Sequence, residues 1–153
     1  MEYNVQQEAR VWNRVMGAPR QETRPVGTDA EAIMEHIAQK QENACLYRVL
    51  AGRVCVRCRN ILLEMANDEL CAVKELSAVY FVMTGRKSCP APAPKPCITC
   101  TAETLRQQYA EVLASAGRYE AMASGEFCYI FHSLAQTAEK HAKKLLCVMG
   151  DTV

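Results

Sequence analysis

Residues 88–100 read "SCPAPAPKPCITC", and they decide how the rest of the chain is arranged. Proline stands at every second position from 90 to 96, which excludes a helix and favours extended polyproline backbone. Such backbone rises about 3.1 Å per residue, so a connection of about 15 residues spans ~40 Å. The stretch ends in a Cys-x-x-Cys pair, Cys97 and Cys100. It therefore predicts a long, stiff connection that delivers two thiols to the start of the next element.

The segments on both sides of this connection have helical patterns. We expect four helices, over residues 28–52, 59–84, 101–124 and 126–149. Thr28 and Glu31 have the spacing of a capping box, while Gly85 and Gly150 stand where the second and fourth helices should end. No segment alternates polar and apolar residues as a strand would. The sequence therefore predicts an all-α protein.

Apolar side chains at three- and four-residue spacing define the predicted core faces. The second helix presents Leu62, Met65, Glu69, Ala72, Leu76, Val79 and Met83. The fourth presents Phe127, Phe131, Leu134, Ala138, His141, Leu145 and Val148. The third presents Leu105, Gln108, Val112, Ser115, Tyr119 and Met122. In the first helix the pattern is ambiguous, and one candidate face is Met34, Ala38, Glu42, Cys45 and Val49.

The lengths of the connections predict the topology. Short connections make the first two helices one antiparallel pair and the last two another. A helix of about 24 residues is about 36 Å long, so the proline-rich connection can cross the whole bundle and start the third helix at the opposite end. We therefore expect a four-helix bundle with a long crossover between its second and third helices.

Composition places limits on the class of protein. The chain has 153 residues, half of them apolar, and a net charge of +1. We expect one bundle domain over residues 28–150, preceded at 1–27 by a linker and a short amphipathic helix around Trp12. Balanced charge argues against nucleic-acid binding. The absence of a long apolar run or a signal peptide argues against a membrane span and favours a cytoplasmic location.

The stretches "ENACLYRVLA", "MANDELCAVKELSAVYFVMTG" and "LAQTAEKHAKKLL" carry a resemblance to a known family. Over about residues 28–150 the chain resembles the ferritin-like superfamily, specifically rubrerythrin-type bundles and small bacterial ferritin-like proteins. In that family each half of the bundle supplies one Glu and one Glu-x-x-His to a di-iron centre. The resemblance assigns Glu42, Glu69 and His141 to ligand positions.

Apolar residues occupy three of the other ligand positions of that family, namely Ala72, Val112 and Ala138. Alanine and valine can neither neutralise the charge of iron nor coordinate it, which argues against a di-iron centre. Three interpretations remain open. Glu69 and His141 form a buried hydrogen-bonded pair, or the three remaining ligands hold a single ion, or an atypical di-metal centre is completed by Glu111 or by domain exchange.

Four of the nine cysteines form the second candidate site. In a long-crossover bundle, Cys55 and Cys58 after the first helix meet Cys97 and Cys100 before the third. Four converging thiolates suit tetrahedral zinc, or iron. The alternatives are unconnected thiols, or redox disulfides within a pair or across the two. Cys89 belongs to the opposite end of the connection. We interpret the helical cysteines as small hydrophobic residues, namely Cys45, Cys71, Cys128 and Cys147.

These patterns favour a non-catalytic ferritin-like protein with an incomplete di-iron site and a four-cysteine zinc or iron site at one end. One alternative is a rubrerythrin-like iron-dependent oxidoreductase or iron-handling protein with an atypical centre. Another is a helical interaction module with a thiol redox switch. Bundles of this class often form homodimers, and the predicted helix around Trp12 is a candidate for that contact.

Overall fold

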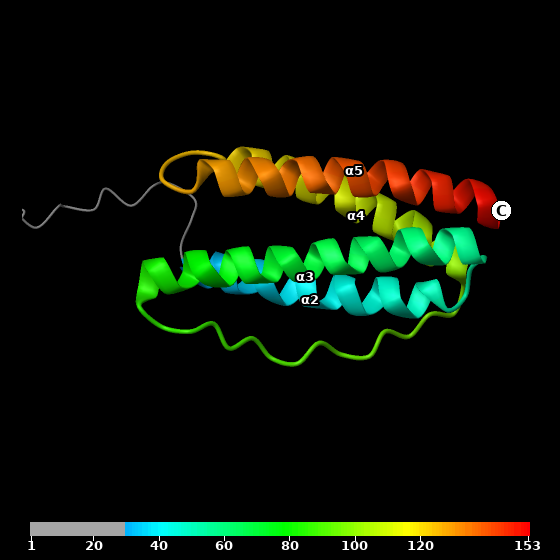
Figure 1. The fold of residues 1–153 in the computed structure, drawn as a ribbon, viewed down its shortest axis with the longest axis horizontal. Helices are drawn as coiled ribbons and strands as arrows, with labels where there is room; N and C mark the ends of the chain where they lie inside the picture. Colours follow the sequence, from blue (N-terminus) through cyan, green and yellow to red (C-terminus); the bar gives the residue numbers. More distant parts are fainter. Residues whose placement is uncertain (1–29) are drawn as a thin grey trace, which may run out of the picture.

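The computed structural model describes residues 30–153, which fold into four helices without any strand (Figure 1). The helices are α2 (Ala30–Ala51), α3 (Val56–Thr84), α4 (Thr101–Met122) and α5 (Cys128–Thr152). The predicted all-α class is therefore confirmed. The predicted helix around Trp12 and the linker after it lie outside the described residues.

The bundle consists of two helical hairpins (Figure 1). In the first, α2 packs along α3; in the second, α4 packs along α5; and α3 lies against α5. Residues 85–100 have no regular secondary structure, and Figure 1 shows them running beside the first hairpin from the end of α3 to the start of α4. The Ser88 hydroxyl donates to the Ser77 hydroxyl at 2.9 Å, and Ile98 is buried. Both contacts hold this segment against the helices.

Two helix ends differ by three residues from those expected. α3 begins at Val56, three residues early, because Cys55 is its N-cap and accepts the Cys58 N–H at its sulfur. α5 continues through Gly150 to Thr152, so the predicted end at Met149 is wrong. Glycine ends a helix most readily where it adopts a positive φ. Gly85 does so at 70° beyond α3, whereas Gly150 is not among the positive-φ residues.

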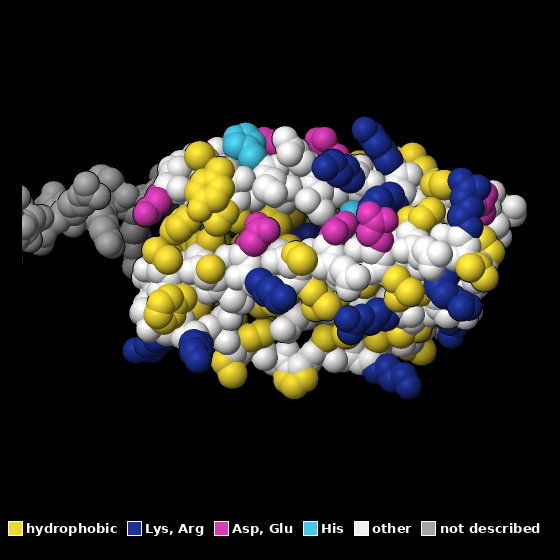
Figure 2. Space-filling view, viewed as in Figure 1, with side chains coloured by type: hydrophobic (Ala, Val, Ile, Leu, Met, Phe, Trp, Pro, Cys, Tyr) yellow, Lys and Arg dark blue, Asp and Glu magenta, His cyan; other side chains and the backbone are white. Residues whose placement is uncertain are grey.

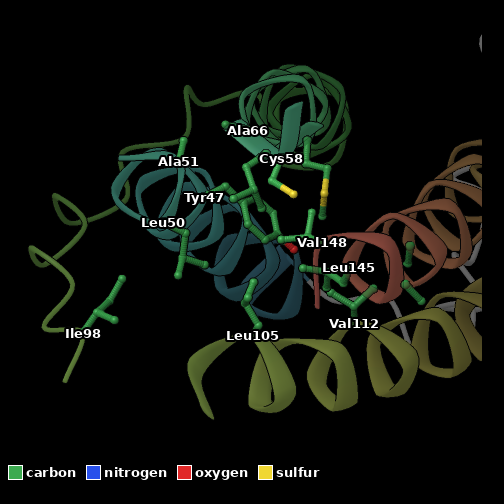
Figure 3. Close-up of a cluster of buried hydrophobic side chains, with 14 of the residues drawn as sticks. Tyr47, Leu50, Ala51, Cys58, Ala66, Ile98, Leu105, Val112, Leu145 and Val148 are labelled. Carbon is green, nitrogen blue, oxygen red and sulfur yellow. The ribbon is translucent and has the colours of Figure 1, made fainter. Parts of the chain in front are cut away.

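The core contains two apolar clusters. The first gathers residues around Tyr47, Leu62, Leu105 and Leu145, and Figure 3 shows that all four helices and Ile98 contribute to it. The second gathers Ile33, Ile37, Ala72, Leu76, Val79, Tyr119, Phe131, Leu134 and Ala135. Along α2 and α3 the clusters are separated by the buried polar residues Lys40, Asn43 and Glu69.

The predicted core faces hold for three helices and fail for one. On α3, α4 and α5 the predicted residues are buried, apart from Met83, Met122 and Phe127 near the helix ends. On α2 none of the five predicted residues is buried. The buried face there is Ile33, Ile37, Lys40, Asn43, Ala44, Tyr47, Leu50 and Ala51. Polar Lys40 and Asn43 interrupt this face, and that hides its apolar periodicity.

Candidate thiol site and buried polar network

Three ligand-type side chains meet where α3 begins and α5 ends. Cys55 is the N-cap of α3, Cys58 lies in its first turn, and Asp151 lies in the last turn of α5. The two sulfurs and a carboxylate oxygen all lie within 4.8 Å of one another. Within residues 30–153 no other three His, Cys, Asp or Glu side chains converge in this way. We call this group the thiol site.

Its two cysteines differ in exposure. Cys55 is exposed, whereas Cys58 is fully buried, and Figure 3 shows Cys58 beside Tyr47 and Val148. The Cys58 backbone N–H donates to Cys55 Sγ at 3.5 Å. The Cys58 thiol donates to Asp151 Oδ2, with 3.6 Å between sulfur and oxygen. Arg57 Nη1 lies 3.8 Å from the same carboxylate oxygen, on an exposed side chain.

The acidities of the two thiols differ because their burial and hydrogen bonds differ. The hydrogen bonds from the backbone N–H and then the thiol of Cys58 lower the pKa of Cys55. Burial, followed by the neighbouring Cys55 sulfur and the Asp151 carboxylate, raises the pKa of Cys58 to about 12. Without a metal ion, Cys55 therefore ionises first and Cys58 stays protonated.

The second Cys-x-x-Cys pair does not join this group. Cys97 and Cys100 are exposed free thiols just before α4, which starts at the same end of the bundle as α3 (Figure 1). The four-cysteine site stays a prediction, and the structure brings Asp151 to the first pair instead. Asp151 was not predicted as a ligand, because Gly150 indicates a helix end before it in the sequence.

The four helical cysteines, interpreted from the sequence as small hydrophobic residues, differ in exposure. Cys71 and Cys147 are exposed, while Cys45 and Cys128 are half-buried. Cys71 is exposed although its neighbour Ala72 is buried, because one residue turns a side chain about 100° around a helix. Cys147 Sγ lies 4.0 Å from Arg57, one turn from the thiol site.

The positions assigned by resemblance lie in the middle of the bundle. Glu69 is buried, with 2% of its side chain exposed, and Lys40 Nζ donates to its Oε1 at 3.1 Å. Asn43 Nδ2 donates to Oε2, also at 3.1 Å. Glu42, assigned as a ligand, is exposed and belongs to the opposite side of α2. The assignment of Glu42 to the core is therefore wrong, and Lys40 and Asn43 face Glu69 in its place.

His141 extends this network toward the surface. Its Nε2 is hydrogen-bonded to Asp68 Oδ2 at 2.9 Å. Its Nδ1 lies 3.2 Å from Glu69 Oε1 and is the one buried side-chain nitrogen or oxygen in residues 30–153 without a well-aligned hydrogen bond. On the other side, Gln108 Nε2 donates to Asn43 Oδ1 and to the Tyr47 hydroxyl. We define the polar network as Lys40, Asn43, Tyr47, Asp68, Glu69, Gln108 and His141.

The polar network does not fit a di-iron centre. The Lys40 ammonium already supplies the positive charge beside Glu69, and a protonated amine has no lone pair for a metal. Buried Ala72 and Ala138 offer no ligand atom. Burial alone would raise the pKa of Glu69, but the contact with His141, the charge of Lys40 and the Asn43 hydrogen bond together lower it. Glu69 is therefore an ionised partner of Lys40.

The surface of the bundle carries both signs of charge. Figure 2 shows acidic and basic side chains together over the upper part of the face in view and basic side chains along its lower part. A shallow cleft of about 350 Å³ between α3 and α5 is lined by Glu64, Asp68, Glu75, Lys140 and Lys144, among others. Lys144 lies 3.0 Å from Glu64 and 3.9 Å from Asp68, so the charges in this cleft largely neutralise one another.

Comparison of the chain with protein-family models, with curated proteins and with solved structures gave no match. None of the helices in residues 30–153 combines the length and apolar character needed to span a bilayer.

Proposed function

We propose that this chain is a ferritin-like four-helix bundle with a proline-rich crossover, and that it binds one zinc or iron ion at the thiol site rather than a di-iron centre in its core. The proposal rests chiefly on the convergence of Cys55, Cys58 and Asp151 ligand atoms within 4.8 Å. Two hairpins, a long connection between them and buried Glu69 and His141 support the ferritin-like type.

The donor set favours a thiophilic ion. Two thiolates and a carboxylate are a ligand combination that zinc accepts, and zinc asks for four ligands in a tetrahedron. Water completes the set in its simplest form. A thiolate of Cys97 or Cys100 completes it if the segment before α4 shifts toward the start of α3, which restores part of the four-cysteine site.

The bound ion would have a structural role. Cys55 and Cys58 belong to the first hairpin and Asp151 to the second, so a shared ion ties the two hairpins together at one end. Metal that binds the folded state alone adds its binding free energy to folding stability. Because Lys40 occupies the core beside Glu69, no oxidase chemistry is part of this proposal.

The test is metal stoichiometry on anaerobically purified protein, with cobalt(II) as a spectroscopic substitute for zinc. We expect about one ion per chain, lost in the Cys55→Ser/Cys58→Ser variant and bound more weakly in Asp151→Asn. Thiolate-to-cobalt absorption counts the sulfur ligands. Unchanged absorption in Cys97→Ser/Cys100→Ser would leave water as the fourth ligand, and a decrease would assign that place to the second pair.

A matched control removes exposed thiols that lie away from the site. The Cys71→Ser/Cys89→Ser variant should keep the full stoichiometry and the full absorption. The proposal is overturned if Cys55→Ser/Cys58→Ser binds as much zinc as the unmodified chain. Two irons per chain, retained in that variant, would instead indicate a metal centre in the core.

A further inference from the structure

We propose that the thiol site is redox-controlled: Cys55 attacks a low-molecular-weight disulfide, Cys58 resolves the product, and the resulting Cys55–Cys58 disulfide releases the bound ion. The exchange is a property of the two cysteines alone. The release of metal rests on the proposed function.

The spacing of the pair permits an internal disulfide. Residues three apart at the start of a helix have neighbouring side chains, with about 5–6 Å between their Cβ atoms. Cys55 has extended backbone, with φ −62° and ψ 164°, and Cys58 follows in the first helical turn. The two sulfurs already lie within 4.8 Å. A disulfide needs Cβ atoms about 3.5–4.5 Å apart, which a small adjustment of the exposed N-cap residue provides.

Exposure fixes the order of the two steps. An incoming disulfide reaches the exposed Cys55 sulfur and cannot reach Cys58, which has no exposed surface. Cys58 lies directly inward of Cys55, where it can attack a mixed disulfide formed there. The structure thus separates an attacking thiol from a resolving thiol.

The Cys55 thiolate attacks one sulfur of R–S–S–R, forming Cys55–S–S–R and releasing RS⁻. The Cys58 sulfur, within 4.8 Å of Cys55 Sγ, then attacks that sulfur, and the Cys58 proton passes to the departing thiolate. This step forms the Cys55–Cys58 disulfide and releases the second small thiol as RSH. Two electrons move from the protein dithiol to the small disulfide.

Metal release follows from the loss of two ligands. A disulfide sulfur is no longer a thiolate and does not hold zinc. Asp151 is then the one remaining member of the group, and a single exposed carboxylate does not retain the ion. Reduction restores both thiolates, so the change is reversible.

The first test uses the metal-free full chain and oxidised glutathione as the probe. Peptide mass spectrometry should find the Cys55–Cys58 disulfide in the unmodified chain. Cys58→Ser should instead accumulate glutathione on Cys55, because the resolving thiol is gone. In Cys55→Ser, Cys58 should be modified at least about tenfold more slowly than Cys55 is in Cys58→Ser. Exposed Cys71, with no other cysteine in its helical turn, should keep its glutathione and serves as the internal control.

The second test follows zinc from the loaded chain with a chelating dye. Oxidised glutathione should release the zinc, and dithiothreitol with added zinc should restore the loaded form. If no zinc binds but the disulfide forms, the proposed function fails and the exchange stands. If zinc binds while Cys55 keeps glutathione as persistently as Cys71, the inference is overturned and the proposed function stands.

Discussion

The ion pair between Lys40 and Glu69 is open to a direct test, because both side chains are almost fully buried and each can be neutralised alone. Lys40→Met removes the ammonium and keeps a flexible chain of similar length. Glu69→Gln removes the negative charge and keeps the shape and one acceptor oxygen. We expect each single variant to be strongly destabilised and the double variant to be destabilised less than either single variant.

The expected magnitude follows from the geometry. Two unit charges 3.1 Å apart attract by about 5 kcal/mol at an effective dielectric constant of about 20. Relaxation of the chain and the remaining contact of Asn43 with Glu69 offset part of the loss in Lys40→Met. Removing one partner of a buried pair costs about 3–5 kcal/mol. We therefore expect a loss of about 3 kcal/mol in the free energy of unfolding of each single variant, and about 2 in the double variant.

Urea unfolding followed by circular dichroism measures these differences by linear extrapolation. Lys74→Met is the matched control, because Lys74 is an exposed lysine of α3, and its free energy of unfolding should stay within about 0.5 kcal/mol of the unmodified chain. The reasoning is refuted if the single variants each lose less than about 1 kcal/mol and their effects simply add in the double variant.

Three further predictions concern acid stability, helix ends and the long connection. The pKa of Glu69 is lowered from 4.5. Its contribution to the free energy of unfolding is therefore complete above about pH 4.5 and is lost as pH falls through the folded-state pKa. Urea titrations at successive pH values should show a smaller loss of stability in acid for Glu69→Gln than for the unmodified chain. Gly85 has φ of 70°, so Gly85→Ala should lower the free energy of unfolding by about 1 kcal/mol. Gly117→Ala, in the exposed interior of α4, should raise it by about 0.5–1 kcal/mol. Equal shifts of the melting temperature in the two variants would contradict the backbone argument. Ile98→Ala removes the buried anchor of residues 85–100, so it should cost about 2–4 kcal/mol and speed proteolytic cleavage of that segment, and unchanged cleavage would show that the anchor lies elsewhere.

The fold could be predicted as far as local patterns determine it. On α3 a single polar residue, Glu69, interrupts an otherwise regular apolar face, so the face was visible in the sequence. On α2 the buried face contains Lys40 and Asn43, which a pattern of apolar residues cannot reveal. Their burial depends on Glu69, 29 and 26 positions away, and so on tertiary packing.

The candidate site, too, could be predicted only where it depends on residues close together in the sequence. The Cys-x-x-Cys spacing of Cys55 and Cys58 is local and predicted a site at the start of α3. Asp151 lies 93 positions from Cys58, and it reaches the pair because α5 continues beyond Gly150. Glycine is compatible with both a helix end and a helix interior, so the sequence alone did not indicate which one applied.

The three connections differ greatly in length, and this orders the assembly of the molecule. Residues 52–55 and 123–127 close their hairpins through contacts local in sequence, and such contacts form fastest. Residues 85–100 join the hairpins, and their prolines keep the two halves tethered but extended before they meet. We therefore expect docking of α5 on α3 to be the slow step. The thiol site takes Cys58 from one half and Asp151 from the other, so we expect it to form in the last stage of folding.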